Sequence, residues 1–133
     1  MSGDDIAVIR GMFEAFNARD AEAMVALTHP DGDVYPMRAQ LEGRGYHGHE
    51  GIREMMDDLF EDWESVEMEL EEFREGDEGI AALGRLKGCG RASGVDVDVP
   101  MGWVWKVADG KAVYAKAYSQ QEDALKDAGV EQE

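Results

Sequence analysis

The spacing of apolar residues changes abruptly at Trp63, and this change limits the folds that the chain can adopt. Between residues 52 and 63 apolar side chains recur every three or four positions, which predicts an amphipathic helix. From Val66 to Glu71 apolar residues alternate with glutamates, which predicts a half-buried strand. Helical patterns before this point and strand patterns after it are typical of an α+β fold, in which helices cover one face of an antiparallel sheet.

Similar patterns assign most of the remaining chain. In chain order they predict a helix over 6–17, a helix over 21–27, a strand over 33–38, a glycine-containing loop over 39–48, strands over 80–87, 95–107 and 112–120, and a short helix over 122–128. Asp20 should cap the second helix and Pro30 should stop it. Asp109-Gly110 is a typical hairpin sequence, so the last two strands should be neighbours.

The chain has 133 residues, of which 44% are hydrophobic, and this is the size of one domain with a substantial core. We therefore predict a single domain over residues 1–133, with a curved antiparallel sheet wrapped around three N-terminal helices. In the strand over 95–107, the apolar residues share one parity and should face the helices; they are Val95, Val97, Val99, Met101, Trp103, Trp105 and Val107. The opposite parity should form a wetter face.

The charge is strongly negative. Thirty Asp and Glu residues stand against thirteen Lys and Arg residues, a net charge of -17. Such a surface repels phosphate backbones and anionic lipids, so we expect neither nucleic acid nor membranes as partners. Only five of the basic residues are Lys, and an acid-rich, lysine-poor surface suits a cytoplasm with high internal salt. A halophilic source is therefore a hypothesis.

The single cysteine, Cys89, cannot form an intramolecular disulfide or a multi-cysteine metal cage. The first residues carry no basic segment followed by an apolar stretch, and no apolar run approaches the ~18 residues of a membrane span. These features predict a cytoplasmic protein.

Several local strings, together with the order of the elements, resemble the SnoaL-like domains of the nuclear transport factor 2-like superfamily. The strings lie at residues 16–20, 29–31, 46–53, 91–95, 104–111 and 124–129. This resemblance implies a cone-shaped half-barrel with an apolar pocket between sheet and helices, and commonly a homodimer joined through the outer face of the sheet. Members of the superfamily include isomerases, cyclases, epoxide hydrolases and proteins with no known reaction, so the fold alone assigns no chemistry.

The catalytic positions of these relatives carry other residues here. By resemblance to ketosteroid isomerase, the base Asp falls on Tyr35, the tyrosine of the first helix on Met12, and the late-strand Asp on about Trp103. The general base of SnoaL-type cyclases falls on Ala117. Each replacement removes a group that enolisation or aldol closure needs.

Two remaining polar residues are candidate catalytic groups. Tyr35 could orient a ligand through one hydrogen bond, or it could be an aromatic wall of the pocket. His47 could act as a base near the pocket mouth, since a histidine titrates near neutral pH, while His49 should contribute to the start of the helix that follows. His47 and His49 are weak metal ligands without further histidines nearby, so we expect no metal and no cofactor.

A set of aromatic, methionine and small residues could surround a flat apolar ligand, since methionine is adaptable and tryptophan offers a broad face. The alternative is that these residues form an ordinary core. The predicted pocket residues are Met12, Phe16, Tyr35, Met37, Tyr46, Met56, Phe60, Trp63, Trp103, Trp105, Ala115, Ala117 and Ser119, with Met55 and Met101 nearby. The small residues of the last strand should leave volume opposite the tryptophans.

Tyr114, Lys116 and Tyr118 share the other face of the last strand, where exposed aromatics favour burial against a second copy of the chain. The sequence therefore predicts a homodimer that binds a small apolar molecule. Two hypotheses remain open. One is an isomerase- or cyclase-like enzyme with His47 as base and Tyr35 or Tyr46 as donor, and the other is a noncatalytic ligand-binding or interaction protein.

Overall fold

The computed structural model describes residues 3–131 of the chain as an α+β fold with five helices and a six-stranded sheet. The helices are α1 (Gly3–Asn17), α2 (Ala21–Leu27), α3 (Met37–Leu41), α4 (Gly48–Asp62) and α5 (Gln121–Asp127). The strands are β1 (Thr28–Tyr35), β2 (Tyr46–His47), β3 (Trp63–Glu75), β4 (Ile80–Gly90), β5 (Asp96–Ala108) and β6 (Lys111–Tyr118).

The sheet is curved and does not close. Its strand order is β2-β1-β6-β5-β4-β3, and every pair is antiparallel except β1 with β6. The expected curved antiparallel sheet is confirmed, and it contains one parallel ladder, β1 with β6. A parallel pair needs a long crossover, and here two helices and four strands between β1 and β6 supply it.

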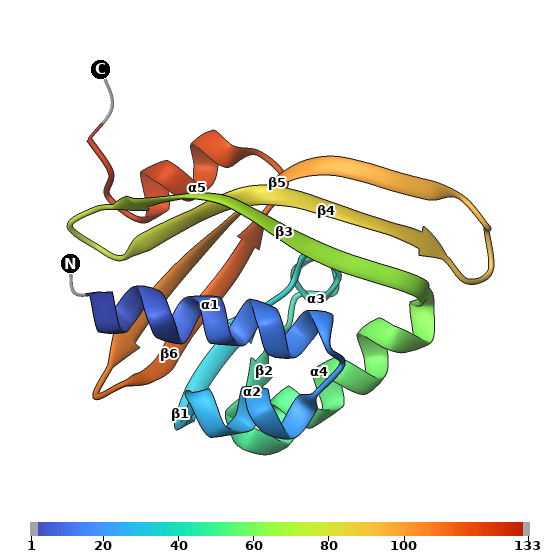
Figure 1. The fold of residues 1–133 in the computed structure, drawn as a ribbon, viewed down its shortest axis with the longest axis horizontal. Coiled ribbons are helices and arrows are strands. Elements are labelled where there is room, and N and C mark those ends of the chain that lie inside the picture. The colour runs from blue at the N-terminus through green and yellow to red at the C-terminus, as the bar shows by residue number, and fades with distance from the viewer. Residues whose placement is uncertain (1–2, 132–133) are drawn as a thin grey trace.

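Helices lie on both faces of the sheet (Figure 1). α1, α2 and α4 lie on the inner, concave face, and α5 lies on the opposite face against β4 and β5. The predicted wetter face of β5 is consequently wrong in its central part, because Val104 is fully buried there in a small second core with Ala81, Leu83, Ala124 and Ala128.

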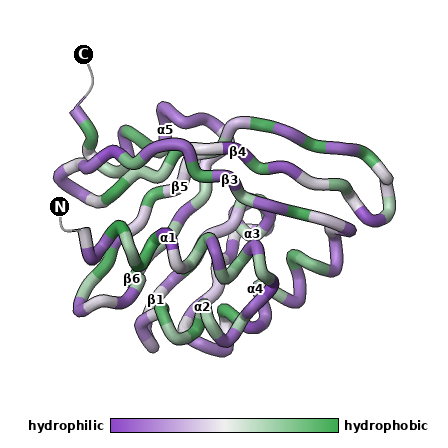
Figure 2. The backbone as a smooth tube through the Cα atoms, in the orientation of Figure 1, coloured by the Kyte–Doolittle hydropathy of each residue, from purple (hydrophilic) through white to green (hydrophobic). Residues whose placement is uncertain are grey.

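Of the two residues predicted to bound the second helix, Asp20 has the predicted role and Pro30 does not. The side chain of Asp20 accepts a hydrogen bond from Ala23 N at 3.0 Å and caps α2. Pro30 does not stop this helix, because the chain is already extended at Thr28. Hydrophilic and hydrophobic residues alternate along β3, as expected of a half-buried edge strand (Figure 2).

The region between β1 and α4 differs most from the prediction. β1 spans Thr28–Tyr35 instead of 33–38, and the expected loop over 39–48 contains the end of α3 and all of β2. Pro36 forms the N-cap of α3 at φ −67°, which suits the start of a helix. The Gln40 side chain donates hydrogen bonds to Tyr35 O and Ala117 O, both at 2.8 Å, and so fixes α3 against β1 and β6.

The far part of the β4–β5 hairpin extends beyond the helices (Figure 1). Val95 and Val99 are therefore 59% and 41% exposed, and the prediction that they face the helices is wrong. Met101, Trp103 and Trp105, further along the same parity, are buried as predicted.

Two glycines have specific structural roles. Gly110 follows Asp109 in the β5–β6 turn, and both have positive φ (74° and 54°), as the predicted hairpin turn requires. Gly102 lies under α5, where a Cβ atom would come within 2.7 Å of Ala124 Cβ. Its missing side chain lets α5 approach the sheet closely.

Candidate functional site

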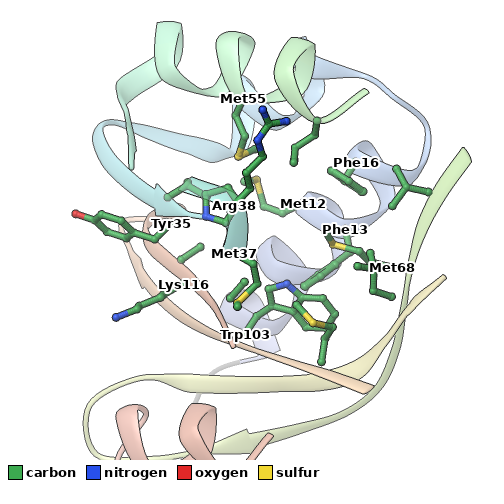
Figure 3. A pocket seen from close by; sticks show the side chains of 18 of the residues that line it. Met12, Phe13, Phe16, Tyr35, Met37, Arg38, Met55, Met68, Trp103 and Lys116 are labelled. Carbon is green, nitrogen blue, oxygen red and sulfur yellow. The ribbon is translucent and has the colours of Figure 1, made fainter. Parts of the chain in front are cut away.

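A cavity of about 210 Å³ lies between the helices and the concave face of the sheet. Figure 3 shows most of its side chains, and the lining residues come from α1, α2, α3, α4 and the strands. Its lining consists mainly of methionine, aromatic and aliphatic residues: Met12, Phe13, Phe16, Met24, Val34, Tyr35, Pro36, Met37, Arg38, Met55, Leu59, Trp63, Val66, Met68, Leu86, Met101, Trp103, Trp105, Ala115, Lys116 and Ala117. None of these residues is Asp, Glu or His.

The register of two strands explains why space remains here. Trp103 pairs directly with Ala117, and Trp105 pairs directly with Ala115, across the β5–β6 ladder. The Phe13 ring, from α1, packs against both indoles. Its centroid lies 4.9 Å from the Trp103 ring centroid and 5.4 Å from the Trp105 ring centroid. The tryptophans are thus held in place from the helix side, while the alanines leave volume beside them.

The rim of the cavity carries charge. Arg38 on α3 forms ion pairs with Asp62 at the end of α4 and with Glu42, and its side chain remains 57% exposed. Arg38 also borders a second, polar hollow of about 150 Å³, which adjoins the cavity because both share Pro36, Arg38 and Leu59.

Tyr46 lies in the second hollow rather than in the apolar cavity. Its hydroxyl donates to Asp58 Oδ2 at 2.6 Å and accepts from Arg44 at 3.2 Å. Burial, followed by the hydrogen bond to Asp58, raises the pKa of the Tyr46 phenol. Tyr46 is therefore a buried structural donor, and the expectation that it lines the pocket is wrong.

The structure brings most of the predicted pocket residues together around the cavity. Those that line it are Met12, Phe16, Tyr35, Met37, Trp63, Trp103, Trp105, Ala115 and Ala117. Met56 is buried in the core without lining the cavity, and Phe60 packs on Phe16 at 5.2 Å beneath the Arg19 guanidinium. Ser119 lies just beyond the end of β6 and is exposed. It therefore does not line the cavity, although it has the same parity as Ala117.

Tyr35 borders the cavity through its strand, but its ring points away from it (Figure 3). The ring packs against Gly45 and lies 5.9 Å from the Tyr114 ring, on the outer face of the sheet. The predicted hydrogen bond from the Tyr35 hydroxyl to a pocket ligand is therefore not supported by this geometry.

His47 does not line the cavity. Its Nδ1 lies 2.7 Å from Asp33 Oδ1, its direct partner across the β1–β2 ladder, and its side chain is 64% exposed. The prediction that His47 lies near the pocket mouth is thus wrong, because β2 pairs with β1 and the His47 side chain contacts Asp33 there. His49 lies in the first turn of α4, with Nε2 2.7 Å from Thr28 O.

The positions that the resemblance assigned to catalysis do gather at the cavity. Tyr35, Met12, Trp103 and Ala117 all border it. At these four positions the cavity is bordered by apolar side chains or by an outward-facing phenol.

The sequence prediction missed one wall of the cavity. Val66 and Met68 on β3, with Leu86 on β4, close it on the side of the long strands. The alternation along β3 indicated that Val66 and Met68 share a face, but their approach to α1 depends on the curvature of the sheet. Asn17 at the end of α1 contributes to this approach, since its side-chain amide makes two hydrogen bonds to the Met68 backbone.

The predicted dimer surface is partly occupied by the chain itself. The hydroxyls of Tyr118 and Tyr114 donate to Asp127 Oδ2 of α5, at 2.8 and 3.4 Å. Burial, followed by the charge of Asp127, raises the pKa of Tyr114 to about 12. Lys116 lies between the two tyrosines along β6, and its side chain points away from the cavity (Figure 3).

Within residues 3–131, no group of three or more His, Cys, Asp and Glu side chains is arranged to hold a metal ion. No helix in this described part of the chain is long and apolar enough to cross a membrane.

Comparison with known proteins extends these observations. Residues 9–115 match the family model of the SnoaL-like domain. A search of the curated proteins found no match.

Solved structures share the fold at low sequence identity. An NTF2-like protein of unknown function from Burkholderia pseudomallei is 22% identical, with a TM-score of 0.78 over 95% of this chain and 97% of that one. TerC co-crystallised with polyporic acid is 20% identical, with a TM-score of 0.78 over 93% and 97%.

A protein with a ketosteroid isomerase-like fold from Catenulispora acidiphila, solved in complex with trimethylamine, is 15% identical. Its TM-score is 0.75 over 93% of each chain. The match of the family model over most of the chain, on a fold that these structures share, shows that the chain belongs to the SnoaL-like domain family.

Proposed function

We propose that this chain binds a small apolar molecule with a ring in the cavity between its helices and its sheet. The observation that carries the proposal is the pairing of Trp103 and Trp105 with Ala117 and Ala115, which leaves an apolar cavity of about 210 Å³. An apolar cavity of about 150 Å³ is large enough for benzene, so this one suits a substituted single ring. The co-crystal of TerC with polyporic acid supports the idea that this fold can hold a small organic molecule.

The proposed activity is binding without turnover. Enolisation and aldol closure need a base beside the substrate, and the described lining residues contain no carboxylate and no imidazole. The Tyr35 ring points away from the cavity, and His47 contacts Asp33 outside it. Both observations support binding without turnover. We therefore favour the noncatalytic alternative over an isomerase- or cyclase-like enzyme.

The test uses α-methylstyrene, a single ring with a small apolar substituent, and the purified protein. Binding should raise the thermal midpoint of the wild type by mass action. Ala117→Leu fills the cavity and should abolish the rise. Ala7→Leu adds the same atoms on the exposed side of α1 and should preserve it. If the midpoint stays unchanged with α-methylstyrene, toluene and naphthalene at their solubility limits, the proposed function is wrong.

The outer face of β6 supports a second proposal, that two copies associate there. Beside α5 it carries a half-buried strip formed by Tyr35, Tyr114, Lys116 and Tyr118. The Tyr35 and Tyr114 rings are 5.9 Å apart, and the Lys116 ammonium lies 5.2 Å from the Tyr118 ring centroid. A continuous aromatic strip of this kind favours burial against a partner surface.

A further inference from the structure

The indole nitrogen of Trp105 is the only buried side-chain nitrogen or oxygen in the described chain, residues 3–131, that has no hydrogen-bond partner. Trp105 is 5% exposed and lines the apolar cavity. A buried donor without an acceptor loses its bond to water and gains nothing in return, which is why native structures contain few of them. An isolated exception in a cavity wall therefore needs an explanation.

The protein offers this N–H group no good substitute acceptor. The Phe13 and Trp105 ring centroids are 5.4 Å apart at an interplanar angle of 65°, and an aromatic face is a much weaker acceptor than an oxygen. Two backbone oxygens of cavity residues, Met101 O and Ala117 O, already accept from Gln121 and Gln40.

We propose, on the basis of the function proposed above, that Trp105 Nε1 donates a hydrogen bond to an oxygen of the bound molecule. The cavity then selects ring compounds that carry a neutral acceptor oxygen, such as a ketone, over hydrocarbons of the same shape. A carboxylate is disfavoured, because an apolar wall cannot solvate a charge and Arg38 at the rim is already paired with Asp62 and Glu42.

The nitrogen is covered by its neighbours in this structure, so the oxygen must displace part of the wall to reach it. Six of the lining residues are methionines, whose unbranched side chains rotate easily and refill irregular space: Met12, Met24, Met37, Met55, Met68 and Met101. This composition makes the wall adaptable on the scale of one oxygen atom.

A matched pair of probes tests the assignment. Acetophenone and α-methylstyrene have nearly the same shape, but only acetophenone has an oxygen in place of the terminal methylene. Trp105→Phe should weaken acetophenone binding about three- to tenfold more than α-methylstyrene binding, the loss expected for one neutral hydrogen bond. Phe13→Leu, a control that changes the same wall without removing a hydrogen-bond donor, should weaken both probes to the same extent.

A second measurement needs no substitution at Trp105. In the wild type, the indole N–H resonance of Trp105, assigned by elimination with Trp63→Phe and Trp103→Phe, should move downfield with acetophenone and much less with α-methylstyrene. Equal losses of both probes in Trp105→Phe, or an unmoved resonance, would overturn the role of Trp105 while leaving the binding function in place. If neither probe binds the wild type, both the proposed function and this inference are wrong.

Discussion

Asn17 and Met68 are 51 residues apart in the chain, yet the Asn17 side chain hydrogen-bonds both the backbone N–H and the backbone carbonyl of Met68. Asn17 Nδ2 donates to Met68 O at 2.9 Å, and Met68 N donates to Asn17 Oδ1 at 2.8 Å. Met68 lies in β3, the edge strand of the sheet, so these bonds cover part of an edge that could otherwise pair with another chain. They also tie the end of α1 to the wall of the cavity.

Asn17→Ala should therefore destabilise the protein. Loss of two partly exposed hydrogen bonds should lower the free energy of unfolding by about 1–2 kcal/mol. Urea denaturation measures this value. Asn17→Asp keeps an acceptor for Met68 N but loses the donor to Met68 O, so it should fall between the wild type and Asn17→Ala. An Asn17→Ala midpoint equal to that of the wild type would contradict this role.

Gly102→Ala should displace α5 from the sheet. The added Cβ would lie 2.7 Å from Ala124 Cβ and 3.3 Å from Gln121 Cα, and overpacking of this kind costs about 1–3 kcal/mol. Ala124→Gly in the same chain removes the clash, so the double variant should lose less stability than the two single losses added together. Strict additivity of the two substitutions would show that they do not meet.

Ionisation of Tyr114 should lower the free energy of unfolding at alkaline pH. Burial and Asp127 raise its pKa to about 12, whereas a tyrosine in the unfolded chain titrates near 10. The folded state keeps the proton longer, so this stabilising contribution is complete below about pH 10 and is lost as the pH rises toward about 12. Ultraviolet titration of the folded protein should show the late phenolate.

Asp127→Asn is the variant that tests this cause. It removes the charge near the Tyr114 and Tyr118 hydroxyls and should move their titration to lower pH. Glu122→Gln removes a charge from the same helix without this contact and should leave the titration unchanged. Identical titrations in both variants would mean that burial alone raises the pKa of Tyr114.

The net charge of -17 should make stability depend on salt. The Debye length falls from about 10 Å at 0.1 M to about 3 Å at 1 M, which weakens repulsion among the acidic side chains. The melting midpoint should rise between low salt and molar potassium chloride, most steeply at the low end. Equal midpoints would count against the halophilic hypothesis.

The proposed association through β6 predicts a dimer in sedimentation equilibrium. Lys116→Glu places a carboxylate in the aromatic strip and should shift the population toward monomer. Lys126→Glu makes the same change of charge on the exposed side of α5 and should leave the dimer intact. A wild type that stays monomeric at high concentration would refute the proposal.

Periodicity in the sequence determined the class of fold and much of the cavity. The change of spacing at Trp63 separates the helices of the concave face from the long strands, and the parity of β5 places Met101, Trp103 and Trp105 together. These predictions succeed because side-chain direction in a regular element follows from the backbone repeat alone.

Tertiary structure alone decided what each face meets. Tyr35, which the resemblance assigned to a base position, turns its ring outward, His47 pairs with Asp33 across a short ladder, and α5 covers Val104 on a face expected to be wet. Val95 and Val99 continue the buried parity of β5 but extend past the helices that would cover them. A local repeat sets which residues share a face, whereas burial and partners depend on long-range pairing and sheet curvature, which no short window of sequence contains.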